Sequence, residues 1–352
     1  MRVTVVGGGI IGLACAWRLA RDGHAVTVVD GAPGVREASW AAAGMLAPHH
    51  EYDPALTIGS DAAQAEALWH LGRASLERWP AFAVALGGPA AVDFRQVGGL
   101  VPVLAEDAPV VEARVAALAR CGIAVEDLRG PALAALAPGL AVERAFRLPA
   151  AQVDPRRTTT ALGAALGPAV CYGERAVAID GTRVVTDRRQ LEADLVVLAS
   201  GAWTPDLAAL AGLDLPGEPV KGQMLRFELP EGVLGAFVHC HQAYLVPRAG
   251  AGLIVGSTMR WSGFDKTEEA EDIALLTASA RRLLPDLAHA PVEHWTGLRP
   301  RLQRGLPLVD QVRPGLIVAT GHFRNGILLT PLTADLVADL AAGRPVPSAV
   351  RA

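Results

Sequence analysis

The chain has 352 residues, of which 51% are hydrophobic, and its formal net charge is −4. This length is sufficient for a large hydrophobic core and two lobes, whereas the acidic balance argues against nucleic acid as a partner. No apolar run approaches the roughly 18 residues that a membrane span needs, so we do not expect a membrane as a partner either.

The first 30 residues have the pattern of a strand, a glycine-rich turn, a helix and a second strand. Arg2 to Val6 predicts a buried strand, and the segment from Gly7 to Gly12 (GGGIIG) matches G-x-G-x-x-G. Ile11 to Arg21 predicts a helix, and His24 to Val29 predicts a second strand that ends at Asp30. This order is typical of a βαβ unit that binds a dinucleotide.

Each part of this unit has a physical role. Gly7 makes the tight turn, Gly9 lets the backbone approach a pyrophosphate, and Gly12 lets the helix pack closely on the strand. The helix N-terminus offers N–H groups and a partial positive charge to the phosphates. Asp30 lies about 20 residues further on, where a carboxylate can accept hydrogen bonds from the ribose hydroxyls.

Hydrophobic periodicity predicts the remaining elements in chain order. Helices are expected at 61–86, 109–120, 155–166, 267–284 and 326–342. Strands are expected at 92–104, 176–179, 183–186, 194–199, 220–229, 243–247, 253–258, 292–301 and 316–319. Pro80 disturbs the first of these helices, and Pro331 leaves open whether the last one starts at Gly326 or is capped by Thr330.

These elements predict an α/β fold in which a Rossmann-like dinucleotide-binding domain carries an inserted, mixed or antiparallel α+β substrate domain. The strand at 194–199 is continuously apolar, as in the interior of a parallel sheet, whereas residues 220–258 alternate like antiparallel strands. The expected dinucleotide domain comprises 1–85, 145–215 and 296–352. The expected substrate domain comprises 86–144 and 216–295.

The cysteines bear on the compartment. Cys15, Cys121, Cys171 and Cys240 show neither C-x-x-C nor metal-ligand spacing, which is typical of free thiols in a reducing compartment. The first strand is expected at residue 2, which leaves no room for a signal peptide before it. We therefore expect a cytoplasmic protein.

Three further segments bear on the choice of dinucleotide, since the fingerprint alone fits NAD or FAD. Ala38 to Leu46 (ASWAAAGML) is rich in small residues that suit close wrapping of the backbone around a flavin. Val196 to Trp203 (VVLASGAW) has the pattern of a strand and turn that pass under an FAD pyrophosphate. Gly321 to Leu329 (GHFRNGILL) precedes a helix, and a helix start at Gly326 would stabilise negative charge on a reduced flavin. No second complete fingerprint follows, which argues against separate FAD and NAD domains.

Together these segments resemble the D-amino-acid oxidase superfamily, and within it the FAD-dependent glycine oxidases of thiamine biosynthesis. The resemblance covers nearly the whole chain. Its specific stretches are SWAAAGMLAP, AQVDPRR, KGQMLRF, YLVPR, LIVGSTM with GFDK, GLRP and GHFRNGILLTP.

The resemblance implies FAD as the cofactor. It assigns flavin contacts to Ile10, Ile11, Asp30, Ser39, Ala43, Gly44, Met45, Val177, His322, Phe323, Arg324, Asn325, Gly326, Ile327 and Leu328. The fingerprint and the two small-residue segments add Gly7, Gly9, Gly12, Ala38, Gly201 and Trp203. Related enzymes that attach the flavin covalently use a cysteine in the C-terminal part of the chain, and this chain has no cysteine after Cys240, so we expect non-covalent FAD.

The resemblance also implies the substrate contacts. Arg299 would grip the substrate carboxylate, Tyr244 would donate its hydroxyl to it, and Arg324 would lie beside it, while Met259 and Met45 would line a small pocket. The residues alone leave other roles open. Arg299 could be a surface residue, Arg324 a structural tie to a carbonyl, Tyr244 part of the core and Met259 a packing residue.

Three positions close to Tyr244 in the sequence also carry polar side chains. Gln242 stands where some members have a histidine, which puts the polarity of the pocket and the substrate range in doubt. His239 and His241 are spaced like a metal-binding pair on one strand face, but no acid or cysteine cluster joins them. We therefore expect a surface pair and no metal site.

The implied activity is oxidation of CH–NH2 groups with oxygen as acceptor. Glycine, sarcosine or D-alanine would give glyoxylate or the matching keto acid, ammonia or amine, and hydrogen peroxide, and the imine would feed thiamine thiazole synthesis. The implied partners are a small amine and oxygen, in a homotetramer. Two alternatives remain open: a broader D-amino-acid oxidase or dehydrogenase, and an FAD-binding redox protein that oxidises no amine.

Overall fold

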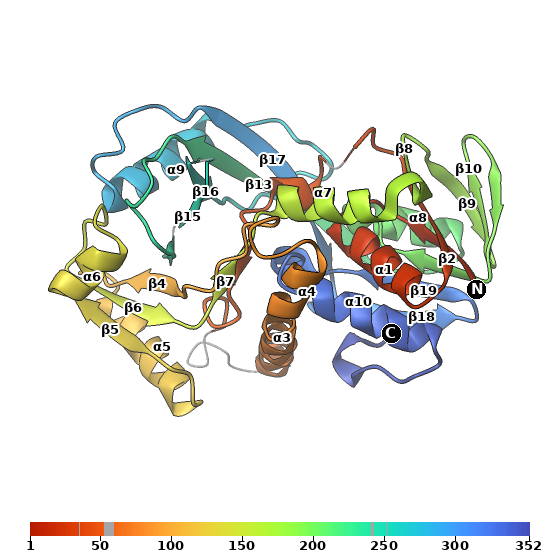
Figure 1. The fold of residues 1–352 in the computed structure, drawn as a ribbon, viewed down its shortest axis with the longest axis horizontal. Coiled ribbons are helices and arrows are strands. Elements are labelled where there is room, and N and C mark those ends of the chain that lie inside the picture. Colours follow the sequence, from red (N-terminus) through yellow and green to blue (C-terminus); the bar gives the residue numbers. More distant parts are fainter. Residues whose placement is uncertain (35, 53–59, 241–242, 251) are drawn as a thin grey trace.

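The computed structural model describes residues 1–34, 36–52, 60–240, 243–250 and 252–352 (Figure 1). None of the helices in these ranges combines the length and the apolar character that a membrane-spanning helix requires. Figure 1 shows two lobes side by side, with β2, β8, β18 and β19 in one and β4, β5, β6 and β15 in the other. Both chain termini lie on the first lobe.

The first lobe is built on a sheet that the described residues form in the order β18-β19-β12-β1-β2-β8. Its neighbouring strands run parallel, except that β18 is antiparallel to β19. The first, middle and last thirds of the chain thus meet in one sheet. Its strands are β1 (Arg2–Val6), β2 (Ala25–Asp30), β8 (Val170–Tyr172), β12 (Leu195–Leu198), β18 (Leu308–Arg313) and β19 (Leu316–Thr320).

Alternation of side chains across this sheet creates a three-layer arrangement. Val5 and Val197 pack on the core shared with α1 (Ile10–Arg21), α7 (Pro155–Leu166) and α10 (Thr330–Ala341). Their neighbours Val6 and Val196 point to the opposite core. Burial of each such side chain stabilises the fold by about 1.5–3 kcal/mol. The opposite layer consists of α8 (Thr204–Leu210) and the small sheet of β9 (Ala176–Asp180), β10 (Arg183–Thr186) and β11 (Gln190–Glu192).

The second lobe is built on a longer sheet, described in the order β17-β13-β16-β15-β14-β4-β6-β5. Its neighbours are antiparallel, except that β14 runs parallel to β4. Leu225 and Phe227 pack with Leu276 of α9 (Ala270–Leu283) in its core. Its strands are β4 (Gly99–Pro102), β5 (Glu126–Arg129), β6 (Arg144–Leu148), β13 (Gly217–Phe227), β14 (Phe237–His239), β15 (Tyr244–Arg248), β16 (Gly252–Gly256) and β17 (Glu293–Leu302).

The remaining elements connect or cover these sheets. They are α2 (Ala38–Ala41), β3 (Met45–Leu46), α3 (Ser60–Leu76), α4 (Trp79–Ala85), α5 (Ala108–Arg120), α6 (Gly130–Leu136), β7 (Ala151–Gln152) and short 3-10 turns at Gly167–Ala169, Gly201–Trp203, Phe323–Asn325 and Ser348–Val350.

The predicted α/β class is confirmed, and so is the interior parallel strand at 194–199, which is β12 between β19 and β1. The expected division into two domains stays a prediction. Its boundaries at 144/145 and 295/296 fall inside β6 and β17.

Three predicted elements differ from the observed ones. The helix expected at 61–86 is two helices, because Pro80 lacks an N–H group and lies in the first turn of α4. The strand expected at 92–104 is only β4, since Asp93 and Gly98 have φ angles of 50° and 79° that break the extended backbone before it. The last helix begins at Thr330, with Leu329 as its N-cap, so both starts left open for it were wrong.

Candidate functional site

A cavity of about 600 Å³ lies where the two lobes meet. On one side it is lined by residues at the carboxyl ends of β1, β2, β12 and β19, namely Val6, Asp30, Ala199 and Thr320. On the other side it is lined by residues of β13, β15 and β17. The crevice beyond the carboxyl ends of parallel strands is where open α/β sheets bind their ligands.

Glycines bring the backbone close together at the first wall. Gly7 has a φ angle of 117°, and a Cβ there would lie 2.4 Å from the carbonyl oxygen of Ala199. A Cβ on Gly12 would lie 1.9 Å from the carbonyl oxygen of Gly7. Both glycines are therefore needed for the turn and for the packing of α1 on the sheet, as the fingerprint predicts.

Asp30 lies at the end of β2 and is tied to the glycine-rich turn. Its carboxylate accepts hydrogen bonds from the N–H groups of Gly8 (2.6 Å) and Ala32 (2.8 Å). Burial raises the pKa of the Asp30 carboxyl, and these two N–H groups partly offset that rise. The carboxylate lines the cavity, where its remaining lone pairs can accept hydrogen bonds from ribose hydroxyls.

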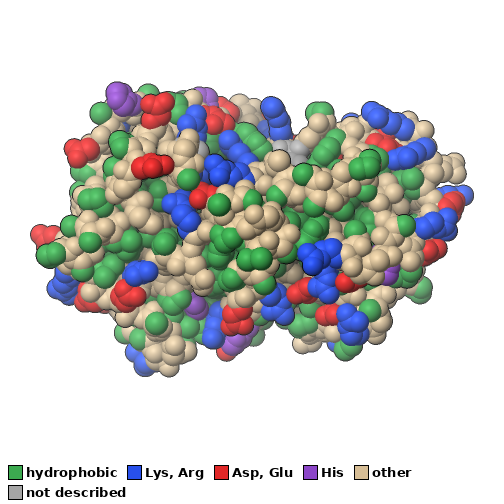
Figure 2. Space-filling model, viewed as in Figure 1, with side chains coloured by type: hydrophobic (Ala, Val, Ile, Leu, Met, Phe, Trp, Pro, Cys, Tyr) green, Lys and Arg blue, Asp and Glu red, His purple; other side chains and the backbone are tan. Residues whose placement is uncertain are grey.

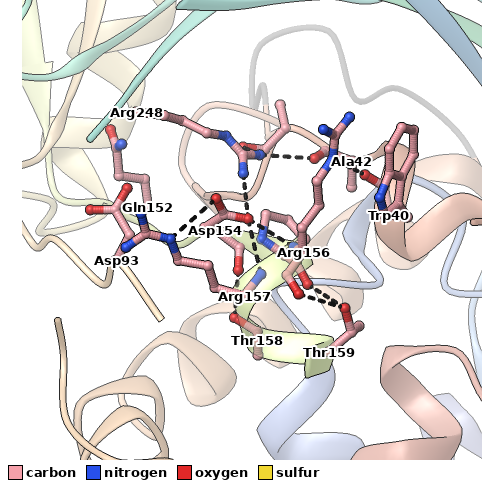
Figure 3. A network of polar contacts seen from close by, with 12 residues as sticks. Trp40, Ala42, Asp93, Gln152, Asp154, Arg156, Arg157, Thr158, Thr159 and Arg248 are labelled. Carbon is pink, nitrogen blue, oxygen red and sulfur yellow. Dashed lines mark hydrogen bonds and ion pairs between the residues drawn. The ribbon is translucent and has the colours of Figure 1, made fainter. Parts of the chain in front are cut away.

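A buried arginine holds the small-residue turn that forms the floor of the cavity. Arg248 of β15 donates hydrogen bonds to the carbonyl oxygens of Ala42 (3.1 Å) and Ala43 (2.9 Å), as Figure 3 shows in part. The same guanidinium lies 2.6 Å from Asp154 (Figure 3). A Cβ on Gly44 would lie 2.0 Å from a neighbouring carbonyl oxygen, so the turn has no room for larger residues.

Asp154 links this turn to α7. Its carboxylate caps the helix by accepting hydrogen bonds from the N–H groups of Arg156 (2.8 Å) and Arg157 (3.2 Å) (Figure 3). Burial would raise the pKa of the Asp154 carboxyl, but the Arg248 charge and these hydrogen bonds hold it below its usual range. Asp154 is thus a helix cap that also holds Arg248 in place.

Arg299 of β17 places a guanidinium in the cavity wall formed by the second lobe. It donates hydrogen bonds to Ser257 Oγ and to the carbonyl oxygen of Thr258 (3.2 Å). A Cβ on Gly222 would lie 2.3–2.5 Å from the guanidinium, so the arginine rests on a glycine of the adjacent strand. Burial lowers the pKa of the Arg299 guanidinium, and the neighbouring Tyr244 hydroxyl partly offsets this effect.

Tyr244 is buried beside Arg299 and lines the same cavity. Its hydroxyl lies 3.3 Å from the sulfur of Met224, a weak acceptor. A better acceptor, such as a carboxylate, could therefore take this donor at little cost.

Arg324 forms a two-pronged ion pair with Glu51. Its Nε and Nη2 atoms each donate to one carboxylate oxygen of Glu51, both at 2.9 Å. The two side chains are 25% and 24% exposed, and both line the cavity. Burial would raise the pKa of Glu51, but the Arg324 charge and a hydrogen bond from His239 hold it well below its usual range. The third nitrogen of Arg324 lies 3.7 Å from Met259 Sδ.

His322 is a buried, neutral member of the cavity lining. Its Nε2 lies 2.9 Å from Thr333 Oγ1 in α10, and burial lowers its pKa to about 4. It therefore contributes no positive charge near neutral pH.

Most residues expected at the site line this one cavity. They are Gly7, Gly9, Ile10, Ile11, Asp30, Ala38, Ser39, Ala43, Gly44, Met45, Gly201, Trp203, Tyr244, Arg299, His322, Phe323, Arg324, Asn325, Gly326 and Ile327. Their individual roles stay predictions.

Four expected residues do not line it. Gly12 packs against the glycine turn, and Leu328 is buried, with its carbonyl accepting hydrogen bonds from Ser75 and Trp79. Val177 is 44% exposed and points away, whereas its neighbour Ala176 lines the cavity. Met259 is 45% exposed, and its sulfur lies 3.7 Å from a nitrogen of Arg324.

Sequence analysis missed several lining residues, among them Glu51, Arg175, Gly222, Met224 and Ser257. Glu51 follows the small-residue segment by a few positions, but no motif marks it. Gln242 and His241 lie outside the described residues. His239 is described, and its Nε2 lies 3.7 Å from Glu51.

Comparison with known proteins gives consistent matches over the length of the chain. Residues 2–340 match the family described as FAD dependent oxidoreductase. The chain is 37% identical to glycine oxidase of Pseudomonas aeruginosa, covering 97% of this chain and 95% of that protein. It is 33% identical to the bifunctional protein ThiO/ThiG of a Nostoc species, covering 96% of this chain and 52% of that protein.

A solved structure is also similar. The crystal structure of glycine oxidase from Geobacillus kaustophilus superposes with a TM-score of 0.85 at 32% identity, covering 98% of this chain and 96% of that chain.

The lowered pKa of His322 predicts acid sensitivity of the fold. Between about pH 6.5 and pH 4 the unfolded chain binds a proton at this histidine that the folded protein excludes. The free energy of unfolding should therefore be highest above this window and fall as pH is lowered, by at most about 3 kcal/mol from this group. His49, whose pKa is also lowered to about 4, adds to the same window.

Urea unfolding of wild type and His322→Gln at several pH values between 4 and 7 measures this effect. The variant should show a shallower loss of stability with falling pH, because one excluded proton is removed. Parallel pH profiles for the two proteins would contradict the buried, neutral state of His322.

Proposed function

Because the chain belongs to the family of FAD-dependent oxidoreductases, we propose that it oxidises glycine and similarly small amines such as sarcosine and D-alanine. The products are glyoxylate or the matching keto acid, ammonia or an amine, and hydrogen peroxide. The observation that carries the proposal is the Arg299 guanidinium, held with the Tyr244 hydroxyl in the same cavity as the dinucleotide-binding turn.

The residues of the cavity fit FAD. Gly7 and Gly44 let backbone segments approach each other closely at two turns that line the cavity, and Asp30 offers a carboxylate at the position suited to a ribose. Ser39 Oγ accepts a hydrogen bond from the N–H group of Ile10 (2.9 Å), which joins the small-residue segment to the first turn of α1. FAD held by these residues would supply an acceptor for the hydride of the substrate Cα and a route for the electrons to oxygen.

Arg299 is proposed to bind the substrate carboxylate. A guanidinium has five N–H groups, and the bonds to Ser257 and Thr258 use only part of them. The planar fork of an arginine matches the two oxygens of a carboxylate. Tyr244 would donate its hydroxyl to the same carboxylate. Holding the carboxylate in this way fixes the position of Cα, and fixed geometry is the main contribution that the protein makes to such a hydride transfer.

Three broader features belong to the proposal. Similarity to glycine oxidases and ThiO/ThiG proteins supports a role in supplying the glycine imine for thiamine thiazole synthesis.

We also propose a cytoplasmic homotetramer. Light scattering of the purified protein should give four times the mass of the chain, and a monomer mass would remove the tetramer from the proposal.

An anaerobic titration with glycine tests the activity directly. The visible band of the bound flavin should bleach as glycine is added, and admission of air should restore it with formation of peroxide. A flavin band that bleaches only with bulky D-amino acids would favour the broader oxidase. Bleaching without peroxide on admission of air would indicate a dehydrogenase, and a band that no amine bleaches would leave a redox protein of another kind.

Removal of the Arg299 guanidinium should weaken glycine binding while FAD stays bound. Charge-assisted hydrogen bonds contribute roughly 1.5–3 kcal/mol each, so loss of two should raise KM by about 100-fold or more. Steady-state kinetics of Arg299→Ala, with the flavin absorbance of the purified variant as a control, measures this. An unchanged KM would contradict the assignment.

Gly222→Ala disturbs the same arginine without removing it. The new Cβ would overlap the guanidinium, so KM should rise by about tenfold or more. Gly163→Ala in α7 is the matched control, because its Cβ would meet only Tyr172 Oη at an ordinary 3.7 Å. Equal kinetics for the two alanine variants would show that Gly222 does not position Arg299.

A further inference from the structure

Two of the arginines that line the cavity, Arg299 and Arg324, interact electrostatically with each other, but their surroundings differ. Arg299 is hydrogen-bonded to a hydroxyl and a carbonyl, both neutral. Arg324 has one whole edge of its guanidinium occupied by the carboxylate of Glu51, through two bonds of 2.9 Å. Of these two arginines, Arg299 therefore has no carboxylate among the hydrogen-bond partners described for it, whereas the charge of Arg324 is paired with Glu51.

The three side chains interact with one another electrostatically. The charge of Arg324 lowers the pKa of Arg299 and that of Glu51 raises it, while burial has the largest effect on this pKa. All three side chains also line the same cavity. Each is partly shielded from water, which strengthens its interactions with a ligand.

We propose that Glu51 is a specificity determinant that occupies Arg324 and thereby restricts the cavity to amines with one carboxylate. A substrate with a second carboxylate, such as an N-carboxymethyl amino acid, would have to place that group beside Glu51 or displace Glu51 from Arg324. The first arrangement brings like charges close together, and the second leaves the partly buried Glu51 carboxylate without its cation. Both disfavour binding.

The inference deepens the proposed amine oxidation and rests on it for its meaning. Glycine, sarcosine and D-alanine each carry one carboxylate, which Arg299 alone can bind. Without the Glu51 charge, the freed edge of Arg324 would offer two N–H groups in a fork that fits a second carboxylate. The accepted substrates would then include iminodiacetate, which reacts with oxygen and water to give glyoxylate, glycine and hydrogen peroxide.

Binding of ligands that cannot be oxidised tests this inference independently of turnover. Diglycolate has two carboxylates joined through an ether oxygen, and methoxyacetate has the same ether with one carboxylate. Calorimetric titration of the FAD-loaded protein gives Kd for each. In Glu51→Gln, Kd for diglycolate should fall about tenfold or more relative to that for methoxyacetate. Glu51→Ala should give the same change, and it serves as a second variant if the glutamine variant does not retain flavin.

Two controls separate this effect from a general change of charge or fold. Glu218→Gln removes a carboxylate that pairs with Arg301 outside the main cavity (2.7 Å), and it should leave the diglycolate-to-methoxyacetate ratio unchanged. The double variant Glu51→Gln with Arg324→Met should lose the gain, because the freed arginine is no longer present.

Turnover gives a second readout. The ratio of kcat/KM for iminodiacetate to that for N-ethylglycine, which has similar size and one carboxylate, should rise about tenfold or more in Glu51→Gln. If the wild type oxidises glycine but neither ratio changes in the Glu51 variants, Glu51 is only a structural tie and the inference is wrong. If no amine reduces the wild-type flavin, the proposed oxidation fails instead, and the two failures are distinguishable.

Discussion

The placement of the Arg299 guanidinium over Gly222 is the constraint on which the site depends. A charge that is partly removed from water loses solvation, and the burial that lowers the pKa of Arg299 reflects this cost. The pairing of β13 with β17 stabilises the strands that hold the guanidinium and so offsets this cost. It extends from Gly217 opposite Leu302 to Arg226 opposite Glu293. Only a glycine at position 222 lets the guanidinium lie against the adjacent strand. The second lobe is thus the rigid support of one cation.

The first lobe meets this support through small residues. Gly297 of β17 lies so close to α2 that a Cβ there would come within 2.5 Å of Ala41 Cβ. On the other side of the turn, Arg248 binds the carbonyl oxygens of Ala42 and Ala43 and is itself held by Asp154. Surface charges of both signs are interspersed on the face that Figure 2 shows. The close contact at Gly297 and the hydrogen bonds of Arg248 thus connect the two walls of the cavity.

Sequence analysis could anticipate the features that depend on neighbours in the chain. The βαβ unit, the helix at 155–166 and the strand in the interior of the parallel sheet follow from local spacing and apolar periodicity. The pairing of Arg324 with Glu51 could not be anticipated in this way, because it joins residues 273 positions apart. The need for glycine at 222 follows from the register of two distant strands. The strand that contains Val177 shows a similar difficulty, because successive side chains of a strand point to opposite faces. Ala176 lines the cavity, whereas the next side chain, Val177, is exposed.

The titratable groups divide the cavity into two regions of different charge. At the dinucleotide end, Asp30 is surrounded by N–H groups, and Glu37 is neutralised by Lys266 at 3.0 Å. At the opposite end, the described side chains Arg299, Arg324 and Glu51 together carry one excess positive charge. His322 and His50 do not change this balance near neutral pH, because burial keeps the pKa of each well below its usual value. A ligand with a single negative charge matches this end of the cavity, whereas a neutral or doubly negative ligand leaves a net charge in a partly buried space. Charge balance and the close fit of Arg299 on Gly222 therefore favour the same class of ligand, a small molecule with one carboxylate.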